Sequence, residues 1–324
     1  RFAANKDTNF VFHMLSVARC GYDNAYGNFY RPYYLEEDLK VIKENEQLLT
    51  VCGGEHCGML YGLMVAEPAC AKISAKDYYA ELIEMADKGD VPENFREYTD
   101  IVCRISAVMM KYYNHYMENI WPTEEKKIRA YMPQVLCFFE ETDFTDKAEA
   151  FVGCRLSSEY FTATLVASIE NGAEAIDISN EQDVFGIVRD PLYAFYFIGH
   201  EFIIYLLFHA LEGEDAFRSL DTWNLTEGLA EYYLKKITGE LVFDSHQTYV
   251  EFYEECEKNE RQIKKNKNKT YTYSNNNNRN NIHHNGTLLF YFQNRKSQSA
   301  APKAAYQGSD TSFVSSHSLL PADA

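Results

Sequence analysis

The chain of 324 residues is 46% hydrophobic and 24% charged, as is usual for globular proteins, and is long enough for one large domain or two modest ones. This length excludes a small scaffold that depends on disulfides for its stability. With 31 Lys and Arg against 48 Asp and Glu, the net charge is −17. Such a chain repels phosphate backbones, so we expect no nucleic-acid partner.

The eight cysteines are scattered without a Cys-x-x-Cys pair, which argues against a zinc ribbon and against a clear disulfide framework. Cys52 and Cys57 bracket a Gly-Gly-Glu-His run, but one short loop supplies too few well-spaced ligands for a metal site. Because the sequence begins at Arg1, an N-terminal piece such as a signal peptide can be missing from it. The sequence therefore assigns no cellular compartment.

Residues 1–150 are expected to form a helical N-terminal region. In stretches such as residues 77–89 and 96–121, apolar residues recur every three or four positions, which is the period of an amphipathic helix. This pattern indicates core packing rather than chemistry, and nothing before residue 150 resembles a family.

A small sheet is expected next. Four segments are rich in the Val, Ile, Phe and Thr residues that favour strands: residues 151–156, 161–170, 173–179 and 183–188. Asn171 and Gly172 stand between the second and third segments and suit a type I′ turn. We therefore expect those two segments to form an antiparallel hairpin.

Residues 192–211 predict a helix that is buried on all sides, because the run is apolar almost all round. Pro191 before it suits the first turn of a helix. His200, Glu201 and His209 interrupt the run, whereas a membrane span needs about 18 or more uninterrupted apolar residues. We therefore expect a core helix and no membrane span.

A further helix is expected to begin at Asn224, which can cap it together with Glu227, and to end at Gly239. A last helix is expected over about residues 245–263. The Asn- and Lys-rich residues 264–324 lack the apolar content to fold alone, so we expect them to form a disordered tail.

The adjacent His200 and Glu201 require an explanation, because burying both in an apolar helix is costly unless each finds a partner. In zinc peptidases, a buried helix with a His-Glu-x-x-His run binds Zn²⁺ through its two histidines, and the glutamate activates the bound water. Here the run is His-Glu-Phe-Ile-Ile, so Ile204 takes the place of the second histidine.

A second run, Thr-Glu-Gly-Leu-Ala-Glu-Tyr-Tyr, begins at Thr226. Together the two runs resemble the gluzincin branch of the zinc metallopeptidases, in which a second helix supplies a glutamate ligand. The resemblance covers roughly residues 150–240 and implies a zincin-like region over residues 151–263. The expected fold is α+β and mainly helical, with a small antiparallel sheet packed on the His-Glu helix.

Carried over to this chain, the resemblance makes His200 and Glu227 zinc ligands and Glu201 the catalytic general base. Glu231 becomes a candidate for orienting a ligand. The implied cofactor is Zn²⁺, the implied activity is hydrolysis of peptide bonds by a metal-activated water, and the implied partners are peptide or protein substrates. Four residues are available as donors to the transition state: Tyr232, Tyr233, His246 and Tyr249.

Ile204 leaves the implied site one ligand short, since a catalytic zinc ion normally has three protein ligands. His209 and Tyr205 do not replace it, because at about 100° per residue they point away from His200 on a continuous helix.

Glu231 lies one turn after Glu227 and can reach a metal or a histidine. It can equally pair with Lys235 at the surface. Without a metal, His200 can instead hydrogen-bond to Glu227 in the core.

Two functions follow from this ambiguity. One is a zinc peptidase with an unusual ligand set, and the other is an inactive pseudopeptidase that serves as a binding or structural module. Other chemistry has no starting point, because the sequence contains no dinucleotide-binding, Walker, Gly-x-Ser-x-Gly or kinase motif.

Overall fold

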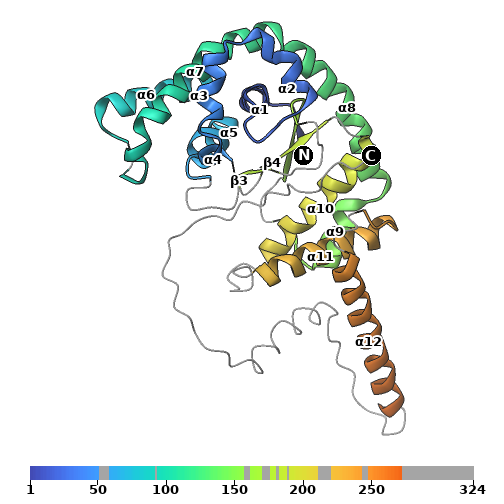
Figure 1. Ribbon diagram of the computed structural model, residues 1–324. Coiled ribbons are helices and arrows are strands. Elements are labelled where there is room, and N and C mark those ends of the chain that lie inside the picture. The colour runs from blue at the N-terminus through green and yellow to red at the C-terminus, as the bar shows by residue number, and fades with distance from the viewer. Residues whose placement is uncertain are drawn as a thin grey trace. The chain divides into compact units, whose positions relative to one another are not determined.

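The computed structural model describes residues 1–50, 58–91, 93–156, 161–169, 176–179, 182–187, 190–210, 220–242 and 247–271. Within these ranges the chain is mainly helical with a small sheet, as Figure 1 shows. The described residues divide into two compact units. Unit 1 comprises residues 1–147 and 156–205, and unit 2 comprises residues 148–155 and those that follow 205.

Helix α1 (Lys6–Ala18) is almost entirely buried in unit 1. The other helices up to residue 141 are α2 (Ala25–Tyr30), α3 (Glu36–Lys43), α4 (Glu46–Leu49), α5 (Glu67–Cys70), α6 (Ala75–Lys88), α7 (Thr99–Asn119) and α8 (Trp121–Glu141), with the short turns η1 (Arg31–Tyr33), η2 (Gly62–Ala66) and η3 (Glu93–Tyr98). Figure 1 shows α1 inside the arc formed by α3, α7 and α8, and it contacts all three. The burial of α1 follows from this central position.

Local signals fix the ends of these helices. The side chain of Asn5 caps α1 by accepting from the backbone N–H groups of Asp7 and Thr8, and Ser74 caps α6 in the same way. Gly89 ends α6 with a φ of 74°, a left-handed conformation that favours glycine. The predicted helices over residues 77–89 and 96–121 are confirmed as α6 and α7.

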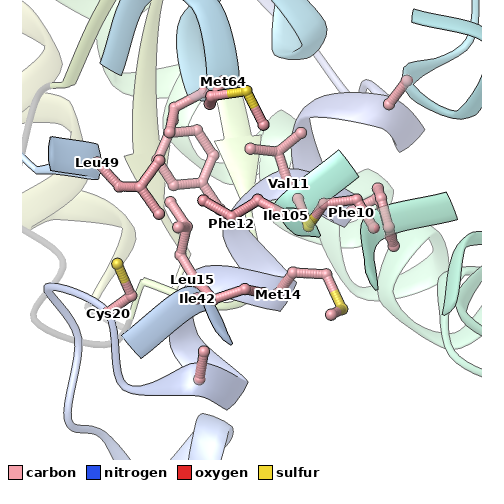
Figure 2. Close-up of a cluster of buried hydrophobic side chains, with 14 of the residues drawn as sticks. Phe10, Val11, Phe12, Met14, Leu15, Cys20, Ile42, Leu49, Met64 and Ile105 are labelled. Carbon is pink, nitrogen blue, oxygen red and sulfur yellow. The ribbon is translucent and has the colours of Figure 1, made fainter. Parts of the chain in front are cut away.

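The core of unit 1 is a cluster of apolar side chains around α1. Figure 2 shows Phe12 and Leu15 of α1 near Ile42 of α3, Leu49 of α4 and Met64 of η2.

Cys20 lies directly after α1 and is fully buried in the same cluster (Figure 2). Burial, and after it the charge of Glu46, raises the pKa of the Cys20 thiol to about 12. The thiol is therefore kept in its protonated, unreactive form.

The sheet joins the beginning of the chain to its middle. Its strands are β1 (Phe2–Ala3), β2 (Thr162–Val166), β3 (Ile176–Ser179) and β4 (Gln182–Gly186), in the order β1-β2-β4-β3. β1, β2 and β4 run parallel to one another, and β3 pairs with β4 in the antiparallel direction. Asn9 of α1 fastens this sheet to the helices, because its amide donates to the carbonyl of Leu165 at 3.0 Å and accepts from the N–H of Ala167 at 3.2 Å.

The expected antiparallel sheet is therefore wrong in its main pairing. β2 and β3 are not neighbours, because β4 lies between them and pairs with β2 in parallel. All five residues of β2 are buried, as is typical of an interior strand of a parallel sheet rather than of one arm of an exposed hairpin. The predicted turn at Asn171 and Gly172 lies outside the described residues.

Helix α10 (Pro191–Ala210) begins at the predicted proline. Phe195 contacts the rings of Phe138, Phe139 and Phe144. Among the described residues α10 alone is long and apolar enough to cross a membrane. Of its most apolar 18-residue stretch, 67% is buried inside the structure.

Helix α9 (Phe144–Val152) occupies the start of the first predicted strand segment, residues 151–156, so that prediction is wrong. Phe144 and Ala148 are both fully buried, and their spacing of four residues continues a helical pattern. Gly153 follows with a φ of 76°, which suits the end of a helix.

Unit 2 contains α11 (Leu220–Thr238) packed against α12 (Gln247–Tyr271). The expected start at Asn224 is wrong, because α11 begins a turn earlier and no Gly or Pro in that turn breaks it. The expected end at Gly239 is confirmed by its φ of 86°. α12 also continues to Tyr271, so the first part of the expected tail is helical, and the four lysines of residues 264–271 favour a helix.

Candidate functional site

His200 and Glu201 lie in the middle of α10 and are both buried. Ile204, one turn after His200, is 5% exposed and packs into the interior as an ordinary apolar residue. Gly199 precedes the pair because no larger residue fits: a Cβ at this position would lie 2.6 Å from the ring of Phe144. The local sequence of α10 is therefore shaped by close aromatic packing around its polar pair.

Glu227 and Glu231 lie one turn apart on α11, and both are buried. Gly228 between them is also required by packing, since a Cβ there would lie 2.0 Å from the Cβ of Tyr249 on α12. The glycine of the Glu-Gly-Leu-Ala run thus has a structural explanation that does not involve a metal.

Glu231 has a defined partner in the chain that follows α11. Its Oε1 accepts a hydrogen bond from the backbone N–H of Val242 at 2.6 Å, and the residue is 0% exposed. The predicted alternative of a surface carboxylate paired with Lys235 is wrong, because Lys235 pairs with Glu254 of α12 at 2.8 Å. The carboxylate of Glu231 is therefore used to hold the backbone after the helix.

The residues of the implied zinc site belong to different units. His200 and Glu201 are part of unit 1, whereas Glu227 and Glu231 are part of unit 2. Within the described ranges, no group of three or more His, Cys, Asp or Glu side chains is arranged to hold a metal ion. Because Ile204 cannot coordinate a metal, the donor set does not fit a zinc ion with three protein ligands.

Of the four candidate transition-state donors, Tyr232 has a hydrogen-bond partner on α12, and Tyr249 packs against Gly228. The hydroxyl of Tyr232 donates to Glu257 of α12 at 2.9 Å. Burial raises the pKa of Tyr233 to about 12. His246, like the Cys52 to Cys57 loop, lies outside the described residues.

Sequence reasoning missed a second buried polar cluster, in unit 1, centred on His13 of α1 and Glu124 of α8. His13 is 0% and Glu124 1% exposed. The Nδ1 atom of His13 lies 2.5 Å from the hydroxyl of Tyr26, and its Nε2 atom lies 2.6 Å from the hydroxyl of Tyr34.

Glu124 accepts from two tyrosines. The hydroxyl of Tyr26 donates to its Oε1 and the hydroxyl of Tyr116 donates to its Oε2 at 2.5 Å. Glu124 also lies in the first turn of α8, where the helix dipole favours a negative charge. We name the set of His13, Tyr26, Tyr34, Tyr116 and Glu124 the tyrosine network.

The only signal for the tyrosine network in the sequence is the position of His13 within the apolar run Val-Phe-His-Met-Leu. A histidine buried in such a run needs partners, but nothing in the sequence identifies residues as distant as Tyr116 and Glu124.

No protein-family model, curated protein or solved structure matches this chain. The function must therefore be argued from the residues and their geometry.

Proposed function

We propose that this chain is a zinc-peptidase-like protein without a working metal centre, which acts as a binding or structural module for peptide or protein partners. The proposal rests on the resemblance of the His200 and Glu227 runs to the gluzincin pattern. The observation that carries it is the burial of Ile204 at the position of a zinc ligand.

Two further contacts support a structural use of the motif. Gly228 allows α12 to approach α11, and Glu231 accepts from the backbone of Val242. In each case a residue of the peptidase-like pattern makes a contact within unit 2 that needs no metal.

The competing candidate is a zinc peptidase in which an unrecognised ligand replaces Ile204. The buried pair of His200 and Glu201 favours this reading, because an apolar helix carries such residues at a cost. In such an enzyme Glu201 would accept a proton from the attacking water.

Zinc content distinguishes the two candidates. We expect the natural protein, purified without chelator, to contain far less than one zinc per chain by elemental analysis. Ile204→His should gain zinc, because it restores the second histidine one turn after His200.

Ile203→His is the matched control, since Ile203 is equally buried on α10 but points about 100° away from Ile204. It should gain no zinc. One zinc per chain in the natural protein, lost in His200→Ala and accompanied by hydrolysis of a peptide mixture, would overturn the proposal in favour of the peptidase. No zinc in Ile204→His would remove the support for the peptidase-like frame.

A further inference from the structure

The directions of the hydrogen bonds in the tyrosine network follow from counting protons. Tyr26 has one hydroxyl proton, and it is donated to the carboxylate of Glu124. The oxygen of Tyr26 must therefore accept from His13, so the Nδ1 atom of His13 carries the ring proton.

The other ring nitrogen is then fixed as well. A neutral imidazole has one donor and one acceptor, so Nε2 accepts from the hydroxyl of Tyr34. The donors point in one direction, from Tyr34 through His13 and Tyr26 to Glu124.

We infer that the tyrosine network is a proton switch, in which uptake of one proton at Glu124 reverses this chain of hydrogen bonds and moves the ring proton of His13 from Nδ1 to Nε2. The switch stands on the geometry of the network: each link is a hydrogen bond between buried or half-buried groups, and the hydroxyl of Tyr26 is bonded both to the histidine and to the carboxylate.

The proton count balances along the chain. Tyr26 gives its hydroxyl proton to Oε1 of Glu124 and receives the Nδ1 proton of His13. Nε2 of His13 receives the hydroxyl proton of Tyr34, and Tyr34 takes a replacement proton from a hydronium ion of the solvent. The network gains one proton, the carboxylate becomes a carboxylic acid, and the imidazole stays neutral.

After the change every donor again has an acceptor. The carboxylic acid donates to Tyr26, Tyr26 donates to Nδ1, and Nε2 of His13 donates to Tyr34. A proton placed on His13 alone would instead bury an imidazolium ion, which is far less favourable.

The surroundings of the network favour protonation of Glu124 over protonation of His13. Burial raises the pKa of Glu124 above its ordinary value of 4.5, although the hydrogen bonds from Tyr116 and Tyr26 and the charge of Lys127 oppose the shift. Burial, and after it the charge of His115, lowers the pKa of His13 to about 3. The titratable groups that face the pair from neighbouring elements are Tyr26 and Tyr30 of α2, Tyr34, His115 and Tyr116 of α7, and Lys127 of α8.

Nuclear magnetic resonance of the full chain with ¹⁵N-labelled histidine tests the switch, because nitrogen shifts distinguish the two neutral tautomers from the imidazolium ion. At neutral pH we expect His13 with its proton on Nδ1. On acidification it should convert to the Nε2 tautomer across the titration of Glu124 and remain neutral throughout.

Two tyrosine variants give a matched comparison. Tyr26→Phe removes the link, so the tautomer of His13 should no longer change with the titration of Glu124. Tyr116→Phe removes a donor to Glu124 but keeps the link, so the conversion should persist and move to higher pH by about one pKa unit.

Three results would overturn the inference. These are an Nε2 proton on His13 at neutral pH, conversion of His13 to imidazolium in place of the tautomer change, and a tautomer that does not change in the natural protein. The titration of the natural protein decides between them even if a variant fails to fold.

Discussion

Two histidine and glutamate pairs are buried in the described part of the chain, His13 with Glu124 and His200 with Glu201. His13 and Glu124 are joined through the hydroxyl of Tyr26, and each has a second tyrosine partner. These bonds offset the cost of burying an imidazole and a carboxylate. The tyrosines therefore act as the polar lining of a site that would otherwise be too apolar for a charge.

The role of Glu231 can be tested by removing its carboxylate. Glu231→Ala leaves the N–H of Val242 without this acceptor, so we expect the free energy of unfolding to fall by about 1–3 kcal/mol. Denaturant unfolding in the presence of a metal chelator measures the loss.

Glu255→Ala is the comparison variant for this measurement. Glu255 lies on the exposed surface of α12, and its removal should change the stability by less than about 0.5 kcal/mol. If Glu231→Ala lost stability only when zinc was present, Glu231 would instead belong to a metal site.

Single residues show where prediction from the sequence stops. Burial of His200 and Glu201 could be predicted, because their helix is apolar almost all round. The partner of Glu231 could not, since Val242 donates from its backbone and any residue type would do so. Tyr116 and Glu124 meet His13 only because three helices converge, which no local pattern encodes.

Among the described residues, Gly199 and Gly228 are examples of positions where a helix contact depends on the absence of a side chain. The ring of Phe144 packs directly against Gly199 in unit 1, and Tyr249 packs directly against Gly228 in unit 2. Glycine is unfavourable within helices by about 1 kcal/mol relative to alanine. Its presence at these positions therefore indicates that close packing outweighs helix propensity.

This balance predicts a destabilising effect of Gly228→Ala. The added Cβ would lie 2.0 Å from the Cβ of Tyr249, so α12 must shift, and we expect a loss of about 1–2 kcal/mol despite the better helix propensity of alanine. Thermal unfolding followed by circular dichroism measures the change.

Gly62→Ala serves as the control, because it measures the effect of alanine's better helix propensity without a clash. Outside its own helical turn, no atom of the described residues lies within 4 Å of a Cβ at Gly62, so this variant should be neutral or slightly more stable. A Gly228→Ala protein as stable as the natural one would show that the contact with Tyr249 is not needed for the packing of α11 on α12.

Helices with a clear period or a long apolar run were predictable in this chain, and strand pairing was not. The periods of α6 and α7 and the apolar run of α10 are local properties of the sequence. β2, in contrast, pairs with β1 at the very start of the chain and with β4 in parallel. Such pairing depends on contacts between distant segments, whereas the Asn-Gly turn favours only a local hairpin.

The whole molecule carries its negative charge unevenly. Residues 257–324 contain 10 Lys and Arg and 4 Asp and Glu, which leaves 21 and 44 for residues 1–256, a net charge of −23. Repulsion among these carboxylates destabilises the compact state at neutral pH. Mild acid would relieve this repulsion, so a loss of stability in mild acid must come from groups whose pKa is lower in the folded than in the unfolded state.

His13 is such a group, and it predicts how global stability changes with pH. Its pKa of about 3 in the folded state lies below the ordinary 6.5, so the unfolded chain binds this proton first. The stabilisation from a neutral His13 is complete above pH 6.5 and is lost as the pH falls toward 3. Between about pH 6.5 and 5 the free energy of unfolding should fall by up to about 1.4 kcal/mol per pH unit on account of His13.

Urea unfolding at a series of pH values measures this slope as a difference between the natural protein and His13→Gln. The variant should lack the contribution, whereas His115→Gln, which changes a half-buried histidine of α7, should keep most of it, because burial is the larger cause of the lowered pKa of His13. Equal slopes in the natural protein and His13→Gln would show that His13 is not held neutral by the fold.

Because Cys20 is buried, the rate of its chemical modification measures how often the core of unit 1 opens. A thiol that is fully buried, with a pKa of about 12, reacts with an alkylating reagent only after the structure around α1 has opened. Cys137 is exposed on α8 and needs no such opening. The rate at which the alkylating reagent modifies Cys20 under native conditions therefore reports the frequency of rare openings of the core, without any denaturant.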